Sequence, residues 1–308
     1  MILVLGSQGQ LGTTLRQQIG QAPEHVFLKR DSSDYCGDIT NTAGITETLM
    51  DLRPEIIINA AAYTAVDQAE TDVESATAIN AKAPAVLAQI AAKMGALLIH
   101  YSTDYVFDGA GTAAHKETDA CHPLSVYGKT KRQGEEGILA SQCRHYILRA
   151  SWLYSAHGNN FLNTMLRLSQ TQEELRVIND QWGAPTSTEL LVNSTLDLIH
   201  LATPGYGSPS TATPPAYGIY HCAPSGETTW FDYARLVIQT AQALGLETKV
   251  KKISPIPSAQ YITAAQRPMN SRLDTTKLRT LLNTSFDDWR EDVIMTVGQA
   301  LREDTHDE

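Results

Sequence analysis

The stretch "ILVLGSQGQLG", Ile2 to Gly12, decides the fold, because it joins a short apolar run to a turn that contains three glycines. Gly6, Gly9 and Gly12 are three residues apart. Small residues at such positions let the backbone turn sharply, approach a pyrophosphate and pack the next helix against a sheet. A helix that begins near Gln10 then offers unpaired N–H groups and a partial positive charge to phosphates. The order of strand, glycine turn and helix predicts a dinucleotide-binding site.

Apolar strands and helical stretches alternate through the first half of the chain. Further strands are predicted at residues 25–28, 55–61, 96–102 and 145–151, and the alanine-rich stretch 78–95 predicts a helix that stops at Gly95. Continuously apolar strands between helices indicate a parallel sheet with both faces covered. We therefore expect an α/β fold, a Rossmann-type doubly wound parallel sheet with a smaller C-terminal α/β portion for substrate binding.

Two portions of the chain are predicted. Residues 1–152, with later segments that return to the sheet, form the NAD(P)-binding Rossmann domain, and residues 153–308 mainly bind the substrate. Residues 203–216 are dense in Pro, Gly, Ser and Thr, which predicts a flexible loop. This loop separates a predicted helix from a short strand, so we interpret it as an insertion and not as a domain boundary.

Composition excludes several classes of function. With 308 residues, 42% hydrophobic and 19% charged, the chain is typical of a globular protein. A net charge of −10 disfavours nucleic acid and anionic membrane surfaces as partners. No apolar run reaches the roughly 18–20 residues that span a bilayer.

Cysteines and the N-terminal sequence indicate a cytoplasmic location. The four cysteines are scattered without a CxxC spacing, which fits incidental thiols in a reducing compartment better than disulfides or a zinc site. The apolar strand follows Met1 directly, so no signal peptide is expected.

The end of the second strand bears on the choice of nicotinamide cofactor. There the sequence "LKRD" places Lys29 and Arg30 before Asp31. A base at this position accommodates the 2′-phosphate of NADPH, whereas an acid accepts hydrogen bonds from the ribose of NADH. The two cations favour NADPH, although Asp31 keeps NADH possible. The alternative is that these residues form only a solvated charged loop, without contact to a cofactor. In "GDIT", Asp38 and Ile39 are predicted to lie beside the adenine.

A third pattern follows on the fourth strand and on the next helix. The predicted strand ends in "STDYVFDG", and "PLSVYGKTK" places Tyr127 four residues before Lys131, so that both share one helix face, whereas Lys129 points away. The glycine turn, a hydroxyl at a strand end and YxxxK together resemble the short-chain dehydrogenase/reductase superfamily, in its extended branch that modifies nucleotide sugars.

The chemistry of that superfamily explains these residue types. Hydride transfer to a ketone creates an alkoxide that needs a proton, and a free tyrosine, with a pKa of about 10, exchanges protons slowly near neutrality. The Lys131 ammonium, helped by the charge of oxidised nicotinamide, is expected to lower the pKa of Tyr127. Lys131 also bonds the nicotinamide ribose, and the Thr103 hydroxyl holds the carbonyl oxygen.

Five segments narrow the resemblance: "STDYVFDG", "PLSVYGKTK", "RASWLYS", "QWGAPTS" and "RPMNSRLD". Together they are similar to the dTDP-4-dehydrorhamnose reductase family, over residues 2 to about 280. This resemblance implies an NAD(P)H-dependent oxidoreductase that reduces the C4 ketone of dTDP-4-dehydro-6-deoxy-L-mannose to dTDP-L-rhamnose. That reaction is the last step of dTDP-L-rhamnose biosynthesis and feeds polysaccharide biosynthesis.

Pattern and resemblance together assign the site residues. The catalytic residues are the proton donor Tyr127, its partner Lys131, and Thr103. The predicted cofactor contacts are Gly6, Gly9, Gln10, Leu11, Gly12, Lys29, Arg30, Asp38, Ile39, Ala62, Tyr63, Thr64, Tyr127 and Lys131. The predicted contacts to the nucleotide sugar are Thr103, Asp104, Trp152 and Arg267, the last of these at the diphosphate because a guanidinium fork suits phosphate oxygens.

Several alternatives stay open. Nucleotide-sugar dehydratases carry Thr-Asp-Glu where this chain has Thr103-Asp104-Tyr105, and the missing glutamate favours reduction over elimination. The enzyme could reduce another nucleotide 4-keto-6-deoxy sugar, or the chain could be a non-catalytic subunit similar to the regulatory subunit of methionine adenosyltransferase. Some related reductases use Mg²⁺ at a dimer contact through a glutamate in the first helix, where this chain has Thr13 and Thr14, although Glu189 is present. No metal ligand is assigned, Mg²⁺ stays uncertain, and a monomer and a homodimer are both compatible with the sequence.

Overall fold

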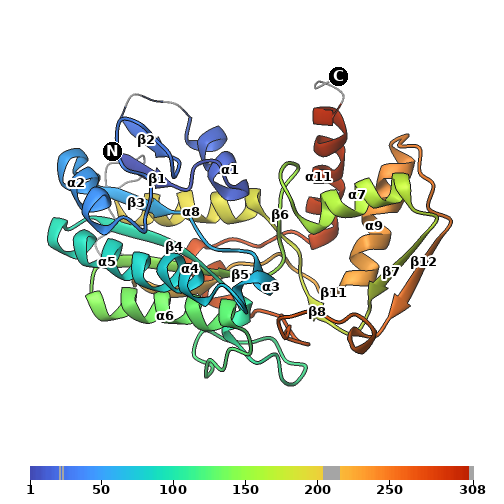
Figure 1. The fold of residues 1–308 in the computed structure, drawn as a ribbon. Coiled ribbons are helices and arrows are strands. Elements are labelled where there is room, and N and C mark those ends of the chain that lie inside the picture. Colours follow the sequence, from blue (N-terminus) through green and yellow to red (C-terminus); the bar gives the residue numbers. More distant parts are fainter. Residues whose placement is uncertain (21, 23, 204–215, 305–308) are drawn as a thin grey trace.

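A six-stranded parallel sheet forms the centre of the computed structural model, which describes residues 1–20, 22, 24–203 and 216–304. Its order is β10-β5-β4-β3-β1-β2 (Figure 1). The strands are β1 (Ile2–Leu5), β2 (His25–Leu28), β3 (Ile56–Asn59), β4 (Leu97–Thr103), β5 (Arg144–Ala150) and β10 (Gly218–His221). The predicted Rossmann-type sheet is therefore confirmed. After β1 the chain adds β2 on one side of it and then β3 on the other, so the direction of strand addition reverses at β1. The carboxyl ends of β1 and β3 flank the crevice where such sheets bind ligands.

Helices cover both faces of the sheet, as the continuously apolar strands predict. One apolar cluster joins the sheet to helices on one face, and a second cluster does so on the other face. The first set is α1 (Gln10–Ile19), α8 (Thr188–Ala202) and α10 (Thr276–Leu282). The second set is α2 (Thr42–Leu52), α5 (Ala83–Met94) and α6 (Val126–Ser141). Most of the loop predicted at residues 203–216 lies outside the described residues.

Short helices connect the strands near the carboxyl edge of the sheet. They are α3 (Val66–Ala69), α4 (Val73–Thr77), the π-helix η1 (Ala78–Lys82) and the 3₁₀ helix η2 (Asp104–Val106). The sequence predicts one uninterrupted helix from residue 78, but its first five residues form the π-helix, and only then does α5 follow. Gly95 ends α5 with φ 68°, as predicted.

The C-terminal portion has a core of its own, next to the carboxyl edge of the sheet (Figure 1). It contains three two-stranded sheets, which pair β6 with β9, β8 with β11, and β7 with β12. The strands are β6 (Leu153–Tyr154), β7 (Glu174–Ile178), β8 (Trp182–Gly183), β9 (Thr186–Ser187), β11 (Thr228–Thr229) and β12 (Lys252–Ile256). The helices are α7 (Phe161–Thr171), α9 (Trp230–Ala243), η3 (Ser258–Gln260) and α11 (Trp289–Asp304).

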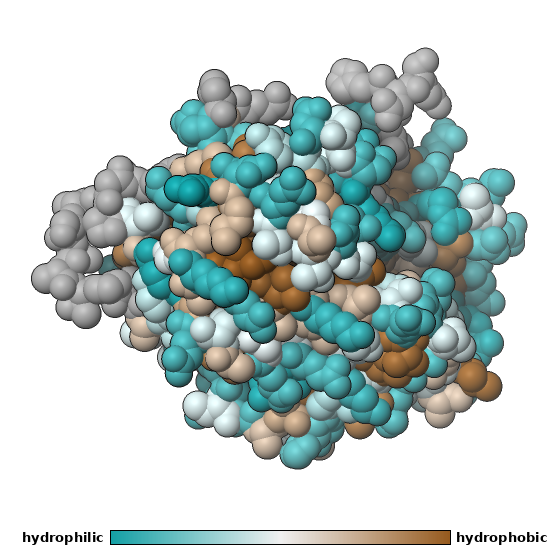
Figure 2. Space-filling model, turned by 60° about the vertical axis from the view of Figure 1, so that its left-hand side comes forward, coloured by the Kyte–Doolittle hydropathy of each residue, from teal (hydrophilic) through white to brown (hydrophobic). Residues whose placement is uncertain are grey.

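Few large apolar side chains of the described residues are exposed, and they are spread over several helices and loops. Met50, Val73 and Leu139, for example, lie on α2, α4 and α6. Figure 2 shows one face that is mainly hydrophilic, with apolar residues gathered across its middle. Within the described ranges, no helix combines the length and apolar character that a membrane span requires.

Helix α6 packs very closely on η1, and a glycine makes this possible. A Cβ atom at Gly134 would lie 2.1 Å from the backbone oxygen of Asn80, far inside van der Waals contact. Because that oxygen belongs to the backbone of the π-helix, it cannot rotate away. The distance between α6 and η1 is therefore set by the missing side chain at this position.

We expect Gly134→Ala to lower the free energy of unfolding by about 1–3 kcal/mol, through overpacking. Gly298→Ala in α11 is the matched control, because its Cβ would have 3.6 Å to the nearest atom. That change should raise stability by about 0.5–1 kcal/mol, since alanine is the better helix former. Urea denaturation measures both. Equal effects of the two substitutions would show that the close contact at Gly134 carries no cost.

Candidate active site and cofactor cradle

The glycine turn predicted from the sequence lies between β1 and α1 and has no room for side chains. A Cβ at Gly6, where φ is 78°, would lie 2.6 Å from the backbone nitrogen of Ala61, and one at Gly12 would lie 2.2 Å from the oxygen of Gly6. Helix α1 begins after Gly9, and no side chain caps it. Its first N–H groups, at Gln10 and Leu11, therefore face outward beside the turn. This cradle fits a dinucleotide pyrophosphate.

The residues predicted to lie beside the adenosine half of the cofactor gather at the tip of β2. Lys29 Nζ lies 3.3 Å from Asp31, and Arg30 Nε lies 3.3 Å from the carboxylate of Asp38. The Arg30 side chain is 76% exposed, so its guanidinium can reach a 2′-phosphate once it leaves this carboxylate. Ile39 is buried in the core between the sheet and its helices, which leaves its backbone as the part nearest to a ligand.

Ala62, Tyr63 and Thr64 follow β3, at the carboxyl edge of the sheet, as predicted. The backbone of Tyr63 is held from both sides by Asn80, whose Oδ1 accepts from the Tyr63 N–H at 2.9 Å and whose Nδ2 donates to the Tyr63 oxygen at 3.0 Å. Asn80 also donates to Thr130 on α6 at 3.3 Å. It thus joins the loop after β3 to helix α6. The sequence analysis missed it, because nothing in an alanine-rich helical pattern signals a π-helix.

Thr103, Tyr127 and Lys131 lie where the end of β4 meets α6. Thr103 ends β4, and its hydroxyl is close enough to the phenol of Tyr127 to favour the ionised form of that phenol. Lys131, one turn further along α6, is buried, and its Nζ donates to the backbone oxygen of Tyr101 at 2.5 Å and lies 3.3 Å from His100 Nε2. Strand β4 therefore holds both the hydroxyl that meets Tyr127 and the oxygen that holds Lys131.

The pKa of Tyr127 differs from the expectation. We expected the Lys131 ammonium to lower it, but burial raises it to about 12; the Thr103 hydrogen bond opposes this shift and the charge of Asp104 adds to it. The Lys131 ammonium is directed to the Tyr101 oxygen, and burial lowers the pKa of Lys131 to about 8. Tyr127 therefore stays protonated at neutral pH, the form that an acid catalyst of ketone reduction needs.

Asp104 is a buried carboxylate with one unpaired oxygen. Thr103 Oγ1 donates to its Oδ1 at 3.1 Å, and the side chain of Ser271 also favours its ionised form, while Oδ2 has no hydrogen-bond partner among the described residues. Burial raises the pKa of Asp104 to about 6, against these hydrogen bonds. A buried acceptor without a partner is costly, so a hydroxyl of a bound sugar is a favourable donor for it.

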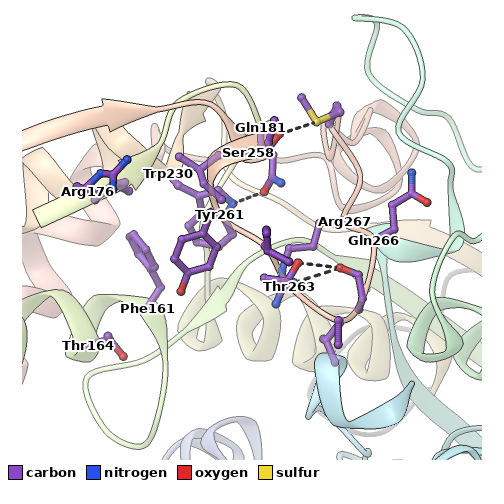
Figure 3. Close-up of a pocket in the computed structure, with 18 of the residues that line it drawn as sticks. Phe161, Thr164, Arg176, Gln181, Trp230, Ser258, Tyr261, Thr263, Gln266 and Arg267 are labelled. Atoms are coloured by element: carbon purple, nitrogen blue, oxygen red, sulfur yellow. Dashed lines mark hydrogen bonds between the residues drawn. The ribbon is translucent and has the colours of Figure 1, made fainter. Parts of the chain in front are cut away.

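A cleft of about 1210 Å³ lies between the Rossmann elements and the C-terminal portion. Figure 3 shows the aromatic rings of Phe161, Trp230 and Tyr261 on one side of it and Arg267 on the other. Tyr105, which follows Asp104, also lines the cleft, and its ring meets that of Tyr127 edge-on at 5.5 Å. Tyr127 does not itself line the cleft, but it lies directly behind the ring of Tyr105 that does.

Trp152 lies behind this lining and supports it. Its indole stacks on that of Trp230 with the ring centroids 3.8 Å apart, and it is Trp230 that lines the cleft. The backbone of Trp152 has φ 49°, a left-handed conformation that is uncommon for a bulky residue and that often marks functional sites. Direct contact between Trp152 and the sugar stays a prediction.

Arg267, predicted to contact the diphosphate, lines the cleft and has a partner that the sequence analysis missed. Its two terminal nitrogens contact the carboxylate of Asp67 on α3, at 2.7 and 3.1 Å. Asp67 also accepts from the backbone N–H of Ala265 at 3.0 Å. The loop that carries Arg267 is thereby tied across the cleft to the Rossmann elements.

The residues considered for Mg²⁺ lie together but bind one another. Thr14 on α1 donates to Thr188 on α8 at 2.9 Å, and Thr188 donates to Glu189 at 3.1 Å. In the part of the chain that the structure describes, no three His, Cys, Asp or Glu side chains form a group that could hold a metal.

Comparisons with known proteins agree with one another. The family model of the RmlD substrate binding domain matches residues 1–301. The dTDP-4-dehydrorhamnose reductase of Escherichia coli K12 is 45% identical over 94% of both chains. The structure of such a reductase from Clostridium acetobutylicum superposes with a TM-score of 0.84 at 33% identity, over 97% of this chain and 98% of that one. One from Bacillus anthracis, solved in complex with NADP, gives 0.83 at 32% over the same shares.

The buried Asp104 should make the protein less stable as pH rises. The pKa of Asp104 is about 6 in the folded protein, against 3.8 for an unperturbed aspartate in the unfolded chain. The folded state therefore binds the proton more tightly, and the protein loses stability as the pH rises from about 4 to about 6. We expect Asp104→Asn to raise the free energy of unfolding at pH 7 by about 2–3 kcal/mol and to have no effect below pH 4. Denaturant titrations at both values measure this. A difference that is independent of pH would contradict it.

Proposed function

This chain belongs to the dTDP-4-dehydrorhamnose reductase family, and we propose that it reduces the C4 ketone of dTDP-4-dehydro-6-deoxy-L-mannose to dTDP-L-rhamnose. It is thus an NAD(P)H-dependent oxidoreductase, and it catalyses the final step of dTDP-L-rhamnose biosynthesis. The observation that carries the proposal is the placement of the Thr103 hydroxyl beside the phenol of Tyr127, next to a cleft large enough for a nucleotide sugar.

Tyr127 and Thr103 perform the protein's part of the reduction. Thr103 offers a hydroxyl to the carbonyl oxygen of the substrate, next to the phenol of Tyr127. The reduced nicotinamide, when bound, supplies the hydride to C4. Tyr127 gives its proton to the oxygen, which becomes the hydroxyl of the product. With a pKa of about 12 the phenol holds this proton until a strongly basic alkoxide develops beside it.

Lys131 supports the proton transfer from the next turn of α6. Its ammonium lies under the site, bonded to Tyr101 O, and has further protons to donate to a ribose hydroxyl. A positive charge below Tyr127 stabilises the phenolate that remains after the proton has left. Because burial lowers the pKa of Lys131 to about 8, this support is lost in alkaline solution.

NADPH is the cofactor that the adenosine end favours. Lys29 and Arg30 place two cations at the tip of β2, and both are in reach of carboxylates that a 2′-phosphate would replace. Phosphate carries more charge than a carboxylate and binds a guanidinium through two oxygens. NADH remains a poorer alternative, because Asp31 and Asp38 can accept from a ribose hydroxyl.

The C-terminal portion holds the nucleotide sugar. The cleft offers aromatic rings for a base and Arg267 for the diphosphate, while Asp104 accepts from the sugar. Arg267 would have to exchange Asp67 for phosphate oxygens, which match its planar fork equally well. We therefore assign cofactor binding to residues 1–152 with the later segments that return to the sheet, and nucleotide-sugar binding mainly to residues 153–308.

Another nucleotide 4-keto-6-deoxy sugar is the second candidate substrate, because the catalytic groups contact only the carbonyl. Side chains on the loops around the cleft decide among such sugars. A purely regulatory subunit is disfavoured by the intact contact of Thr103 with Tyr127.

The purified protein should oxidise NADPH when given freshly generated dTDP-4-dehydro-6-deoxy-L-mannose, and oxidise NADH more slowly. Absorbance at the nicotinamide band and identification of dTDP-L-rhamnose measure this. Unchanged absorbance with cofactor bound would refute the substrate assignment, and the UDP and GDP analogues would then be assayed.

Tyr127→Phe should lower turnover by about 10²–10⁴-fold, the range typical for a general acid, with binding of NADPH retained. Tyr146→Phe is the matched control. That tyrosine is buried on β5, and its hydroxyl has no partner among the described residues, so its loss should leave turnover unchanged. Comparable turnover in both variants would mean that the proton comes from another group.

A further inference from the structure

Glu135 is a buried carboxylate that the proposed mechanism does not use. It follows Tyr127 and Lys131 on α6 at the same spacing of four residues, so the three side chains share one face of the helix. Its side chain is fully buried, although it lies near the middle of a helix whose other acidic residue, Glu136, is 56% exposed. A buried charge in such a place requires an explanation.

Four hydrogen bonds saturate the Glu135 carboxylate. Arg149 on β5 donates to it twice, from Nε at 2.8 Å and from Nη2 at 2.7 Å. Ser102 on β4 donates at 2.6 Å, and Arg132 donates at 3.0 Å. Ser102 and Arg149 are neighbours in the register of the two strands. Glu135 thus links α6 to both strands. Its contact on β4, Ser102, directly precedes Thr103.

We propose that Glu135 is a positioning residue for the reduction: its carboxylate fixes Tyr127 and Lys131 against the end of β4 and is the counter-charge of the buried Lys131 ammonium. The proposal rests on the proposed function. Its geometric part follows from the bonds to Ser102 and Arg149, because they set the rotation and height of α6 on the sheet. Its electrostatic part follows from the place of Glu135, one turn beyond Lys131 in the same dry interface.

The charges around Lys131 support this assignment. On β4 it faces His100, which burial and the lysine charge keep neutral by lowering its pKa. Asp104 lies on η2 and Tyr127 on α6, while Arg149 on β5 adds a positive charge behind Glu135. At the N-terminus of α6, Glu70 accepts from the Val126 N–H. Burial lowers the pKa of Lys131, and Glu135 is the group that opposes this effect.

The test compares Glu135→Gln with the matched control Glu136→Gln. Glu136 is the next residue of the same helix and pairs with Arg132 at 3.0 Å, but it points to solvent. Since Tyr127 keeps its proton far above pH 8, the basic limb of kcat reports Lys131. In Glu135→Gln the basic limb should move by about one pH unit toward acid. At pH values above the limb, turnover should therefore be about tenfold lower than in the wild type. KM for the sugar should not change, and the control should keep the wild-type profile.

Glu135→Gln leaves Arg149 buried without its carboxylate and could prevent folding. The double variant Glu135→Gln, Arg149→Met removes both charges at similar volume and should fold. Because the double variant removes one charge of each sign, it is compared with Arg149→Met, which lacks the same arginine but keeps the carboxylate. If Glu135 is the counter-charge of Lys131, the basic limb of the double variant lies about one pH unit toward acid of the limb of Arg149→Met. Equal basic limbs in these two folded variants would overturn the proposal.

A measurement without substrate separates this proposal from the proposed function. Titration of the ¹³Cε signal of Lys131, assigned with Lys131→Met, should show a lower midpoint in Glu135→Gln than in Glu136→Gln, and a lower one in the double variant than in Arg149→Met. An equal midpoint within each pair would refute the inference even if the wild-type enzyme is active. A displaced midpoint in a protein that reduces no nucleotide sugar would support the pairing of Glu135 with Lys131 and refute the reaction.

Discussion

The active site depends on how closely backbone segments approach one another at the carboxyl edge of the sheet. A Cβ at Gly12 would lie 2.2 Å from the oxygen of Gly6, and one at Gly6 would lie 2.6 Å from the nitrogen of Ala61. The turn after β1, the start of α1 and the end of β3 therefore occupy one layer without intervening side chains. This leaves N–H groups at the start of α1 as the surface offered to a ligand, so that an acidic protein can bind a phosphate through local donors.

Helix α6 is held by the same means, with polar groups added. Gly134 brings it against the π-helix, while the next residue, Glu135, binds Ser102 and Arg149 on the adjoining side that faces the sheet. Between these two contacts, Lys131 donates a hydrogen bond to a backbone oxygen of β4. Each contact is short and directional, and together they leave α6 little freedom to slide or rotate. A proton donor and a hydroxyl must be held within a fraction of an ångström for catalysis, and this arrangement meets that requirement.

Sequence patterns predicted the fold and singled out Tyr127 and Lys131 as candidates because both rest on local patterns. Strand, glycine turn and helix are read from consecutive residues, and Tyr127 and Lys131 from one helical spacing. Contacts between distant segments were not predictable in that way: Asp67 meets Arg267, and Asn80 meets Tyr63, only because the chain folds back. The spacing of Glu135 could have been noticed, since it continues the series of Tyr127 and Lys131. Its role depends on Arg149, which no spacing connects to it.

The pKa of Tyr127 was misjudged for a related reason, and the reason bears on how the site works. Sequence shows which charges are near in the chain but not how dry their surroundings are. In the folded protein burial shifts three groups toward their neutral forms: it raises the pKa of Tyr127 and Asp104 and lowers that of Lys131. Neutral phenol is the form that gives a proton, so burial favours the resting state for reduction. The phenolate left behind is then disfavoured by the same dry surroundings unless a cation stays close. Burial by itself favours the neutral form of Lys131, and the charge of Glu135, one turn further along the same helix, opposes that effect.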